Sequence, residues 1–188
     1  MKANTDLKNK ISFINEVILL KEQTRQGWIR YKIQNPESVA DHSFGLCLLV
    51  LTFCDLLPNL DIKKCLVLAL IHDLAEVRVG DITPHDNISK SEKYCLEKLA
   101  FEYFSHLLED QTFYDLWIEY ESCVTLEAQF VRDLDILESV FQAKRYENYD
   151  VDLEEFWVYA KRAIKTKIGF EIYSLLKSSR RKNNSFAI

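Results

Sequence analysis

Glycine and proline are so scarce in this chain that an all-β fold is hard to build from it. The 188 residues include only 4 Gly and 3 Pro. A β-sandwich or barrel needs a turn about every 8–12 residues, and Gly and Pro supply many of those turns. The sequence therefore predicts an all-α fold.

The length and composition fit one globular domain. Hydrophobic residues make up 48% of the chain, and no repeat or low-complexity segment divides it. We expect a single domain over residues 1–177 and a basic, flexible C-terminal tail over residues 178–188. Residues 161–188 carry eight Lys and Arg against a single acid, whereas the rest of the chain is acidic overall. Because an acidic body repels nucleic acid, we expect no nucleic-acid partner.

The cysteines and the N-terminus favour a cytoplasmic protein. The five cysteines are odd in number and no two are spaced as C-x-x-C, which is typical of free thiols in a reducing compartment. The N-terminus lacks the apolar stretch of a signal peptide. The longest uncharged run, from His42 to Cys54, is shorter than the roughly 18 residues that a membrane span needs. We therefore expect no membrane partner.

Apolar residues at helical spacing recur along most of the chain. A capping box formed by Ser38 and Asp41 begins one helix, and Gly80 ends the next. A polar loop over residues 80–87 follows. The expected helices cover residues 6–22, 38–57, 61–79, 89–108, 112–122, 125–147 and 152–177, the last of them interrupted near Gly169.

Two of these helices are apolar on most faces and yet contain ionisable residues. His42 is on one of them, and His72, Asp73 and Glu76 are on the next. A buried charge is costly unless it is paired or bound to a metal. Imidazole nitrogens and carboxylate oxygens suit a divalent ion such as Mn, Co, Ni, Fe or Zn, and Mg less well. A core histidine paired with a neighbouring acid is the alternative that spacing alone leaves open.

Spacing groups these residues only in part. His72 and Glu76 are four residues apart and share a helix face. Asp73 diverges from His72 by about 100° on a continuous helix. The side chains of His72 and Asp73 could both bind one ion only if the ion lay between the two helix faces that they occupy.

Four segments in one collinear order carry a recognisable set of motifs. They cover residues 36–42, 69–76, 79–84 and 87–93, and His42, His72-Asp73 and a later aspartate follow the pattern H…HD…D. These motifs resemble the HD-domain metal-dependent phosphohydrolases, and more narrowly their 5′-deoxynucleotidase branch, the YfbR/HDDC2-like family. The match spans about residues 7–147. The resemblance implies an HD-domain helical bundle.

The resemblance also implies an activity and a set of ligands. Members of the branch hydrolyse deoxynucleoside 5′-monophosphates to nucleoside and phosphate by a metal-activated water, and they are typically homodimers. One divalent metal ion (Co, Mn, Ni, Fe, Zn or Mg) is expected as the cofactor. Its expected ligands are His42, His72, Asp73 and Asp135.

Further residues are expected to act on water or to contact the substrate. Glu76 and Asp81 are the positions suspected of orienting or deprotonating water, and Trp28 lies where the family contacts the nucleotide sugar. Arg30 and Lys93 are expected basic contacts of the substrate. Four of these residues have a structural alternative: Glu76 as an ordinary neighbour of a buried histidine, Asp81 as a turn former after Gly80, Trp28 as a core residue, and Lys93 as a solvated charge.

The choice of the late aspartate depends on which argument is followed. Asp133 and Asp135 are two residues apart, about 200° around a helix, so only one can face the site. Periodicity directs Asp133 inward, because it shares a side with Phe130 and Leu137. The family motif falls on Asp135. We expect Asp135 to be the ligand, with Asp133 as the second choice.

One departure from the family concerns the sugar. Bacterial members carry an arginine immediately before the tryptophan, where this chain has Gly27, with Arg25 and Arg30 nearby. Selection of deoxyribose over ribose is therefore left open. Two alternative functions also remain: another HD-fold phosphohydrolase or phosphodiesterase, and a non-catalytic nucleotide-binding HD protein. The four histidines of the chain are few for a second ion, and an inactive scaffold has no need of an acid beside each histidine.

Overall fold

The structure is a computed structural model that describes residues 2–149 and 151–180. In these residues it contains ten α-helices, three short 3-10 helices and one isolated β-bridge, and the all-α expectation is confirmed. The helices are α1 (Lys2–Val17), η1 (Ile18–Lys21), α2 (Gln26–Ile29), α3 (Val39–Phe53), η2 (Cys54–Leu56), α4 (Ile62–Ile71), α5 (Glu76–Val79), α6 (Lys90–Leu108), α7 (Thr112–Ser122), α8 (Leu126–Tyr146), η3 (Glu147–Tyr149), α9 (Glu154–Ala163) and α10 (Lys167–Ser178).

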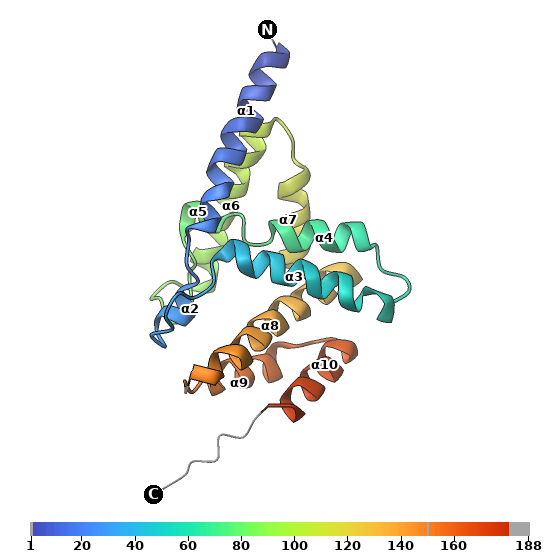
Figure 1. Cartoon of the computed structure of the whole chain (residues 1–188). Helices are drawn as coiled ribbons and strands as arrows, with labels where there is room; N and C mark the ends of the chain where they lie inside the picture. The colour runs from blue at the N-terminus through green and yellow to red at the C-terminus, as the bar shows by residue number, and fades with distance from the viewer. Residues whose placement is uncertain (1, 150, 181–188) are drawn as a thin grey trace, which may run out of the picture.

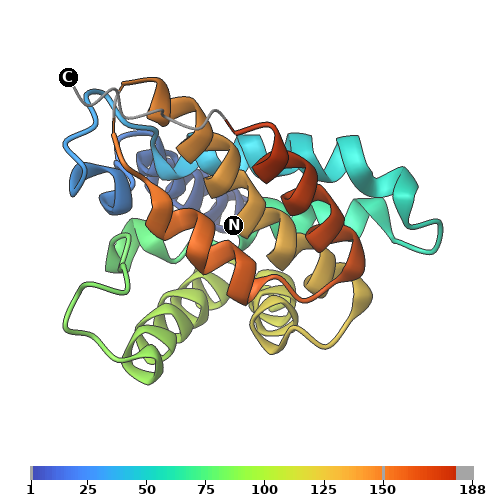
Figure 2. The ribbon, with the colours of Figure 1, turned by 90° about the horizontal axis from the view of Figure 1, so that it is seen from below.

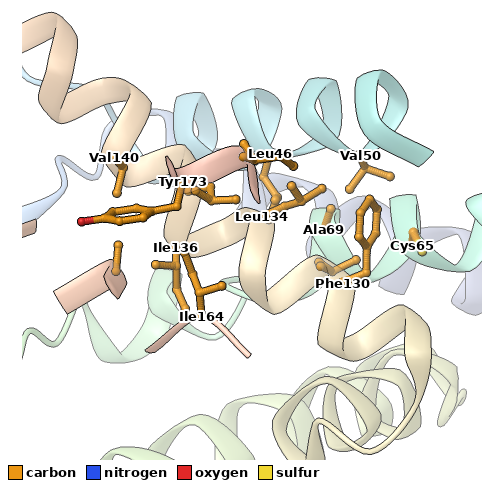
Figure 3. Packing of buried hydrophobic residues seen from close by; sticks show 14 of the residues in the cluster. Leu46, Val50, Cys65, Ala69, Phe130, Leu134, Ile136, Val140, Ile164 and Tyr173 are labelled. Carbon is orange, nitrogen blue, oxygen red and sulfur yellow. The ribbon is translucent and has the colours of Figure 1, made fainter. Parts of the chain in front are cut away.

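Helices α3, α4 and α8 form the centre of the fold, since each packs against the other two (Figure 1). Figure 3 shows side chains of these helices meeting in the main core, among them Leu46, Ala69, Phe130 and Leu134. Helices α9 and α10 pack along α8 (Figure 2). Helices α1, α6 and α7 pack around a second apolar cluster that includes Phe101 and Trp117. Three helices from different parts of the sequence therefore meet at the centre of the bundle.

The expected capping box fixes the first turn of α3. The Asp41 backbone N–H donates to Ser38 Oγ at 3.1 Å, and the Ser38 N–H donates to Asp41 Oδ2 at 2.9 Å. These bonds satisfy backbone donors that a helix start leaves without partners. His42 follows directly and is fully buried. The cap thus sets where this imidazole enters the core.

The helix expected over residues 61–79 is broken, which corrects the sequence prediction. Helix α4 ends at Ile71, a turn covers residues 72–75, and α5 begins at Glu76. The Ala69 carbonyl, which would accept the Asp73 N–H in a continued helix, accepts a hydrogen bond from His72 Nδ1 at 2.9 Å. The backbone then continues in tighter three-residue hydrogen bonds, such as Glu76 N–H to Asp73 O at 3.0 Å. Asp73 is therefore not restricted to the helical direction that sequence spacing assumed.

The last break also lies elsewhere than expected. Residues 164–166 separate α9 from α10, and Gly169 lies inside α10. Asp133 on α8 accepts the N–H groups of Lys165 at 2.9 Å and Thr166 at 2.7 Å, and Thr166 caps α10. A Cβ at Gly169 would lie 2.6 Å from Asp133 Oδ2. Glycine serves here to admit a buried carboxylate, and it does not interrupt the helix.

One segment is long and apolar enough to cross a membrane by length and composition alone, namely Val39–Leu56, of which 28% is buried. In this fold it comprises α3 and η2, and α3 packs against α4 and α8. One side of α3 carries exposed apolar side chains, those of Phe44, Leu48 and Leu51.

The five cysteines are free; Cys65 is buried and Cys95 is exposed. Arg180, near the start of the expected tail, pairs with Glu147 and Glu154. Residues 181–188, the rest of that expected flexible tail, lie outside the described residues.

Candidate metal centre

Four side chains expected as metal ligands converge on one point of the core. His42 comes from α3, His72 and Asp73 from the turn after α4, and Asp135 from α8. His42 Nε2 lies 3.0 Å from Asp135 Oδ1 and 3.9 Å from Asp73 Oδ2. His72 Nε2 lies 3.1 Å from Asp73 Oδ2 and 3.8 Å from Asp135 Oδ1. Residues that are distant in sequence thus form one compact group of nitrogen and oxygen atoms.

The hydrogen bond of His72 tests whether this group fits a cation. Its Nδ1 donates to the Ala69 carbonyl, which can only accept, so the neutral ring carries its proton there. Nε2 then presents a lone pair, and this buried atom has no hydrogen-bond partner in the part of the chain that the structure describes. A lone pair that faces two carboxylates is costly unless a cation lies among them. The donor set, which is imidazole and carboxylate, suits a divalent ion.

The electrostatics of the group favour positive charge. Burial raises the pKa of Asp73, but His72, Arg25 and His42 outweigh it and hold that pKa well below its usual range. Burial also raises the pKa of Asp135, but its hydrogen bond with His42 and the two nearby imidazoles outweigh burial and hold this pKa well below its usual range. Burial and Arg25 lower the pKa of His42, yet the hydrogen bonds with Asp135 and Glu138 raise it to about 10. Both carboxylates therefore stay ionised and attract a cation.

Glu76 lies beside this group with one oxygen unused. It is 2% exposed, and its Oε2 has no hydrogen-bond partner among the described residues. Burial raises its pKa well above the usual range, and the charges of Asp73 and Asp81 raise it further. Lys93 Nζ lies 3.9 Å from Glu76 Oε1. A carboxyl group with a raised pKa in such a place is suited to exchange a proton.

Asp81 and the loop around it line an open cleft of about 490 Å³, together with residues of the η1–α2 connection. Asp81 Oδ2 accepts a hydrogen bond from the Gln26 backbone N–H at 2.6 Å, so this carboxylate connects the loop after α5 with the first residue of α2. Gln23, Gly80 and Asp86 are among the other lining residues. The cleft is in the size range of small-ligand sites, roughly 300–1,000 Å³.

Lys93 is held among acids rather than solvated. Its Nζ donates to the Ile82 carbonyl at 3.2 Å and lies 3.4 Å from Glu97 Oε1. Arg30 is exposed. Hydrogen bonds with Thr83 and, to a smaller extent, the charge of Arg30 lower the pKa of Asp86, a residue of the cleft. Both basic side chains thus lie near the Asp81 loop, and neither forms an ion pair with the four expected ligands among the described contacts.

Trp28, the expected contact of the sugar, lies in the core of this structure. Its side chain is 1% exposed and stacks on Phe156 with ring centroids 4.2 Å apart. Its indole Nε1 donates to Glu37 Oε1 at 2.8 Å. These contacts fit the structural alternative, in which Trp28 is a core residue, and its contact with the sugar stays a prediction.

Two further residues belong to the site and were not predicted. Arg25 Nη1 donates to Asp73 Oδ2 at 3.2 Å, and Nη2 to Ser139 Oγ at 3.5 Å. Glu138 Oε2 lies 2.5 Å from His42 Nδ1. The sequence offers a weak signal for each: Arg25 is a basic residue just before the departure at Gly27, and Glu138 is one helical turn after Asp135.

The helical fold and its His-Asp centre define an HD domain. Residues 17–170 match the HD domain family, and the chain belongs to this family of metal-dependent phosphohydrolases. Its relatives include the 5′-deoxynucleotidase HDDC2 of Danio rerio, which is 42% identical and for which the match covers 81% of this chain and 78% of the relative. The 5′-deoxynucleotidase hdd1 of Schizosaccharomyces pombe is 37% identical, and 78% of each chain is covered.

A solved structure supports the same relationship. The PH0347 protein of Pyrococcus horikoshii superposes with a TM-score of 0.75 at 33% sequence identity, and the match covers 89% of this chain and 96% of that protein. The family resemblance drawn from the sequence motifs is therefore confirmed.

Proposed function

We propose that this protein is a divalent-metal-dependent phosphomonoesterase that hydrolyses deoxynucleoside 5′-monophosphates to nucleoside and inorganic phosphate. The observation that carries the proposal is the convergence of two imidazoles and two carboxylates at one point, where the buried Nε2 of His72 has no hydrogen-bond partner among residues 2–149 and 151–180. The names of the relatives, which are 5′-deoxynucleotidases at 36–43% identity, support the substrate class.

His42, His72, Asp73 and Asp135 are the proposed ligands of one ion. A borderline ion such as Mn, Co, Fe, Ni or Zn suits this mixed nitrogen and oxygen set better than Mg. When bound, the cation supplies Lewis-acid chemistry, because it polarises a phosphate oxygen and makes a water molecule more acidic.

Glu76 is the proposed proton acceptor of the reaction. Hydrolysis adds the oxygen of water to phosphorus and breaks the bond between phosphorus and the 5′-oxygen. The departing 5′-oxygen takes up a proton, in net the one that the water gives up, and leaves as the nucleoside hydroxyl. The attacking water must lose a proton, and Glu76 Oε2, which accepts no hydrogen bond from the residues that the structure describes, can receive it. Lys93, 3.9 Å from the other Glu76 oxygen, favours the ionised form that can accept a proton.

Arg25 is the proposed contact of the phosphate. The carboxylates around it keep its pKa above the ordinary value in spite of burial, so it stays charged. Its guanidinium uses Nη1 on Asp73, and its planar group of N–H donors matches the oxygens of a phosphate. Asp81 and the cleft beside it would then receive the nucleoside part.

Phosphate release from paired ribo- and deoxyribonucleoside 5′-monophosphates tests the proposal. We expect release to require an added divalent cation and to be lost in His72→Ala and Asp73→Ala, whereas His106→Ala, an exposed histidine on α6, keeps wild-type activity. Glu76→Gln should retain the cation and lose turnover. Metal-independent release, or full activity of His72→Ala, would refute the proposal, and nucleotide binding without release would favour the non-catalytic alternative.

A homodimer is the proposed assembly. The exposed apolar side chains of Phe44, Leu48 and Leu51 lie on one side of α3 and support it, because exposed apolar patches mark association sites. Light scattering after size-exclusion chromatography should give twice the mass of 22.1 kDa, and Leu48→Glu should give the monomer mass.

A further inference from the structure

Glu138 and Gly45 form a contact between α8 and α3 behind the metal centre. Glu138 follows Asp135 by one turn of α8 and is buried. Its Oε2 lies 2.5 Å from His42 Nδ1. Gly45 follows His42 by one turn of α3, and a Cβ built there would lie 2.6 Å from the other carboxylate oxygen, Oε1. The glycine therefore makes the space that the carboxylate occupies.

The His42 atom that Glu138 contacts is the ring nitrogen opposite the one that faces the other expected ligands. His42 Nε2 faces Asp135 and Asp73, and Nδ1 faces Glu138. An ionised carboxylate can only accept a hydrogen bond, so it keeps a proton on Nδ1. A ring that carries its proton on Nδ1 can offer the Nε2 lone pair to a cation.

A second cation is the competing explanation for this group. Ligand atoms of Glu37, His42 and Glu138 lie within 4.8 Å of one another. However, Glu37 Oε1 already accepts the Trp28 indole N–H at 2.8 Å. An ion at His42 Nδ1 would also replace the proton that Glu138 holds there, and would leave the ring to bind metal through both nitrogens. The contacts fit an orienting carboxylate better.

We propose that Glu138 is a positioning residue, which fixes the tautomer and the orientation of His42 for the cation, and that Gly45 is required because it admits Glu138. This inference rests on the proposed function, since it assumes that His42 binds the ion. It adds two residues, neither of which touches the substrate, to the set on which cation affinity depends. Carboxylates that hold a metal-binding histidine commonly change metal affinity about 10- to 100-fold when removed.

Titration calorimetry of the metal-free full chain with Mn²⁺ tests the inference without an activity assay. We expect Glu138→Ala and Gly45→Ala to weaken Mn²⁺ binding by about 10- to 100-fold. Glu138→Gln keeps an oxygen that can accept the Nδ1 proton, so its loss should be smaller. The matched control is Gly169→Ala, whose added Cβ would lie at the same distance of 2.6 Å from a buried carboxylate, that of Asp133. Asp133 accepts hydrogen bonds from the α9–α10 connection, and no described contact joins it to His42. Its Mn²⁺ affinity should equal that of the wild type.

A second readout follows the ring itself. In nitrogen-15 NMR spectra of the Zn²⁺-loaded protein, His42 should show a protonated Nδ1 in the wild type, and this signal should change in Glu138→Ala. Wild-type Mn²⁺ affinity in Glu138→Ala would overturn the inference, as would an equal loss in Gly45→Ala and Gly169→Ala. If the wild type bound no divalent cation, the proposed function would fail and the inference with it. If the wild type bound Mn²⁺ and Glu138→Ala bound it equally well, only the inference would fail.

Discussion

Asp133 and Asp135 lie two residues apart on α8, and their carboxylates make contacts with different parts of the molecule. Asp133 accepts the backbone N–H groups of Lys165 and Thr166 at 2.9 and 2.7 Å. Asp135 Oδ1 lies 3.0 Å from His42 Nε2, and its Oδ2 accepts the Tyr120 hydroxyl at 2.7 Å. One carboxylate fastens the α9–α10 connection, and the other belongs to the candidate metal centre.

This division predicts opposite effects for the two alanine variants. Asp133→Ala removes the acceptor of two backbone N–H groups, so the free energy of unfolding should fall by about 2–3 kcal/mol. Asp135→Ala should abolish phosphate release and weaken Mn²⁺ binding with a much smaller effect on stability. Urea denaturation and calorimetric titration of both variants measure these effects. Loss of Mn²⁺ binding in a fully stable Asp133→Ala variant would contradict the assignment.

Arg25 is expected to act on the phosphate and not on the fold. Because a hydrogen bond to a charged group contributes about 1.5–3 kcal/mol, Arg25→Lys should lower kcat/KM about 10- to 100-fold. Mn²⁺ affinity should stay at the wild-type value, because Arg25 is not an expected ligand and lysine keeps the positive charge next to Asp73. Steady-state kinetics beside calorimetry measure both. Arg145→Lys, an exposed arginine of α8, serves as the control and should match the wild type.

Trp28 is expected to support the fold and not the substrate. Trp28→Phe removes the indole N–H that Glu37 accepts and part of the stacking on Phe156. The free energy of unfolding should therefore fall by about 1–3 kcal/mol. KM for the nucleotide should stay at the wild-type value when measured well below the unfolding temperature. A raised KM with unchanged stability would return Trp28 to the substrate site.

The pH dependence of stability should carry the signature of Glu97. Burial raises the pKa of Glu97 to about 7 from 4.5, although Lys93 lowers it. The folded state thus holds this proton more tightly than the unfolded state. Its stabilising contribution is complete below the unfolded pKa and is lost as the pH rises through the folded one.

We therefore expect wild-type stability to fall relative to that of Glu97→Gln between about pH 5 and about pH 8, by up to about 2–3 kcal/mol. Urea denaturation across this pH range measures the difference. Glu102→Gln, a half-buried position on the same helix, should keep the wild-type slope. Equal slopes in the wild type and Glu97→Gln would show that Glu97 does not titrate in this range.

Local signals in the sequence predicted much of the fold. The capping box of Ser38 and Asp41 lies within one turn, so it could be recognised without knowledge of the rest of the chain. The break after Ile71 could not, because the apolar periodicity continues through Leu74 and Val77. The helix ends where the His72 side chain, in place of the Asp73 backbone N–H, donates to the Ala69 carbonyl. The spacing of apolar residues does not reveal which of these two donors bonds to the carbonyl.

The residues of the site were also predicted only in part. The motifs placed His42, His72, Asp73 and Asp135 in one group, and the structure brings these four side chains together. Glu138 was not predicted, because its hydrogen bond with His42 depends on how α8 packs against α3. Periodicity correctly directed Asp133 inward, to 1% exposure, but the reason is the backbone of residues 165–166 and not an ion.

The central claim is that one divalent cation is held by two imidazoles and two carboxylates. A crystal of the Mn²⁺-loaded protein, measured at a wavelength where manganese scatters anomalously, tests it most directly. The account predicts one anomalous peak per chain, at bonding distance from His42 Nε2, His72 Nε2 and a carboxylate oxygen each of Asp73 and Asp135. A peak bound elsewhere, or fully loaded crystals whose peak is bonded to neither histidine, would contradict it.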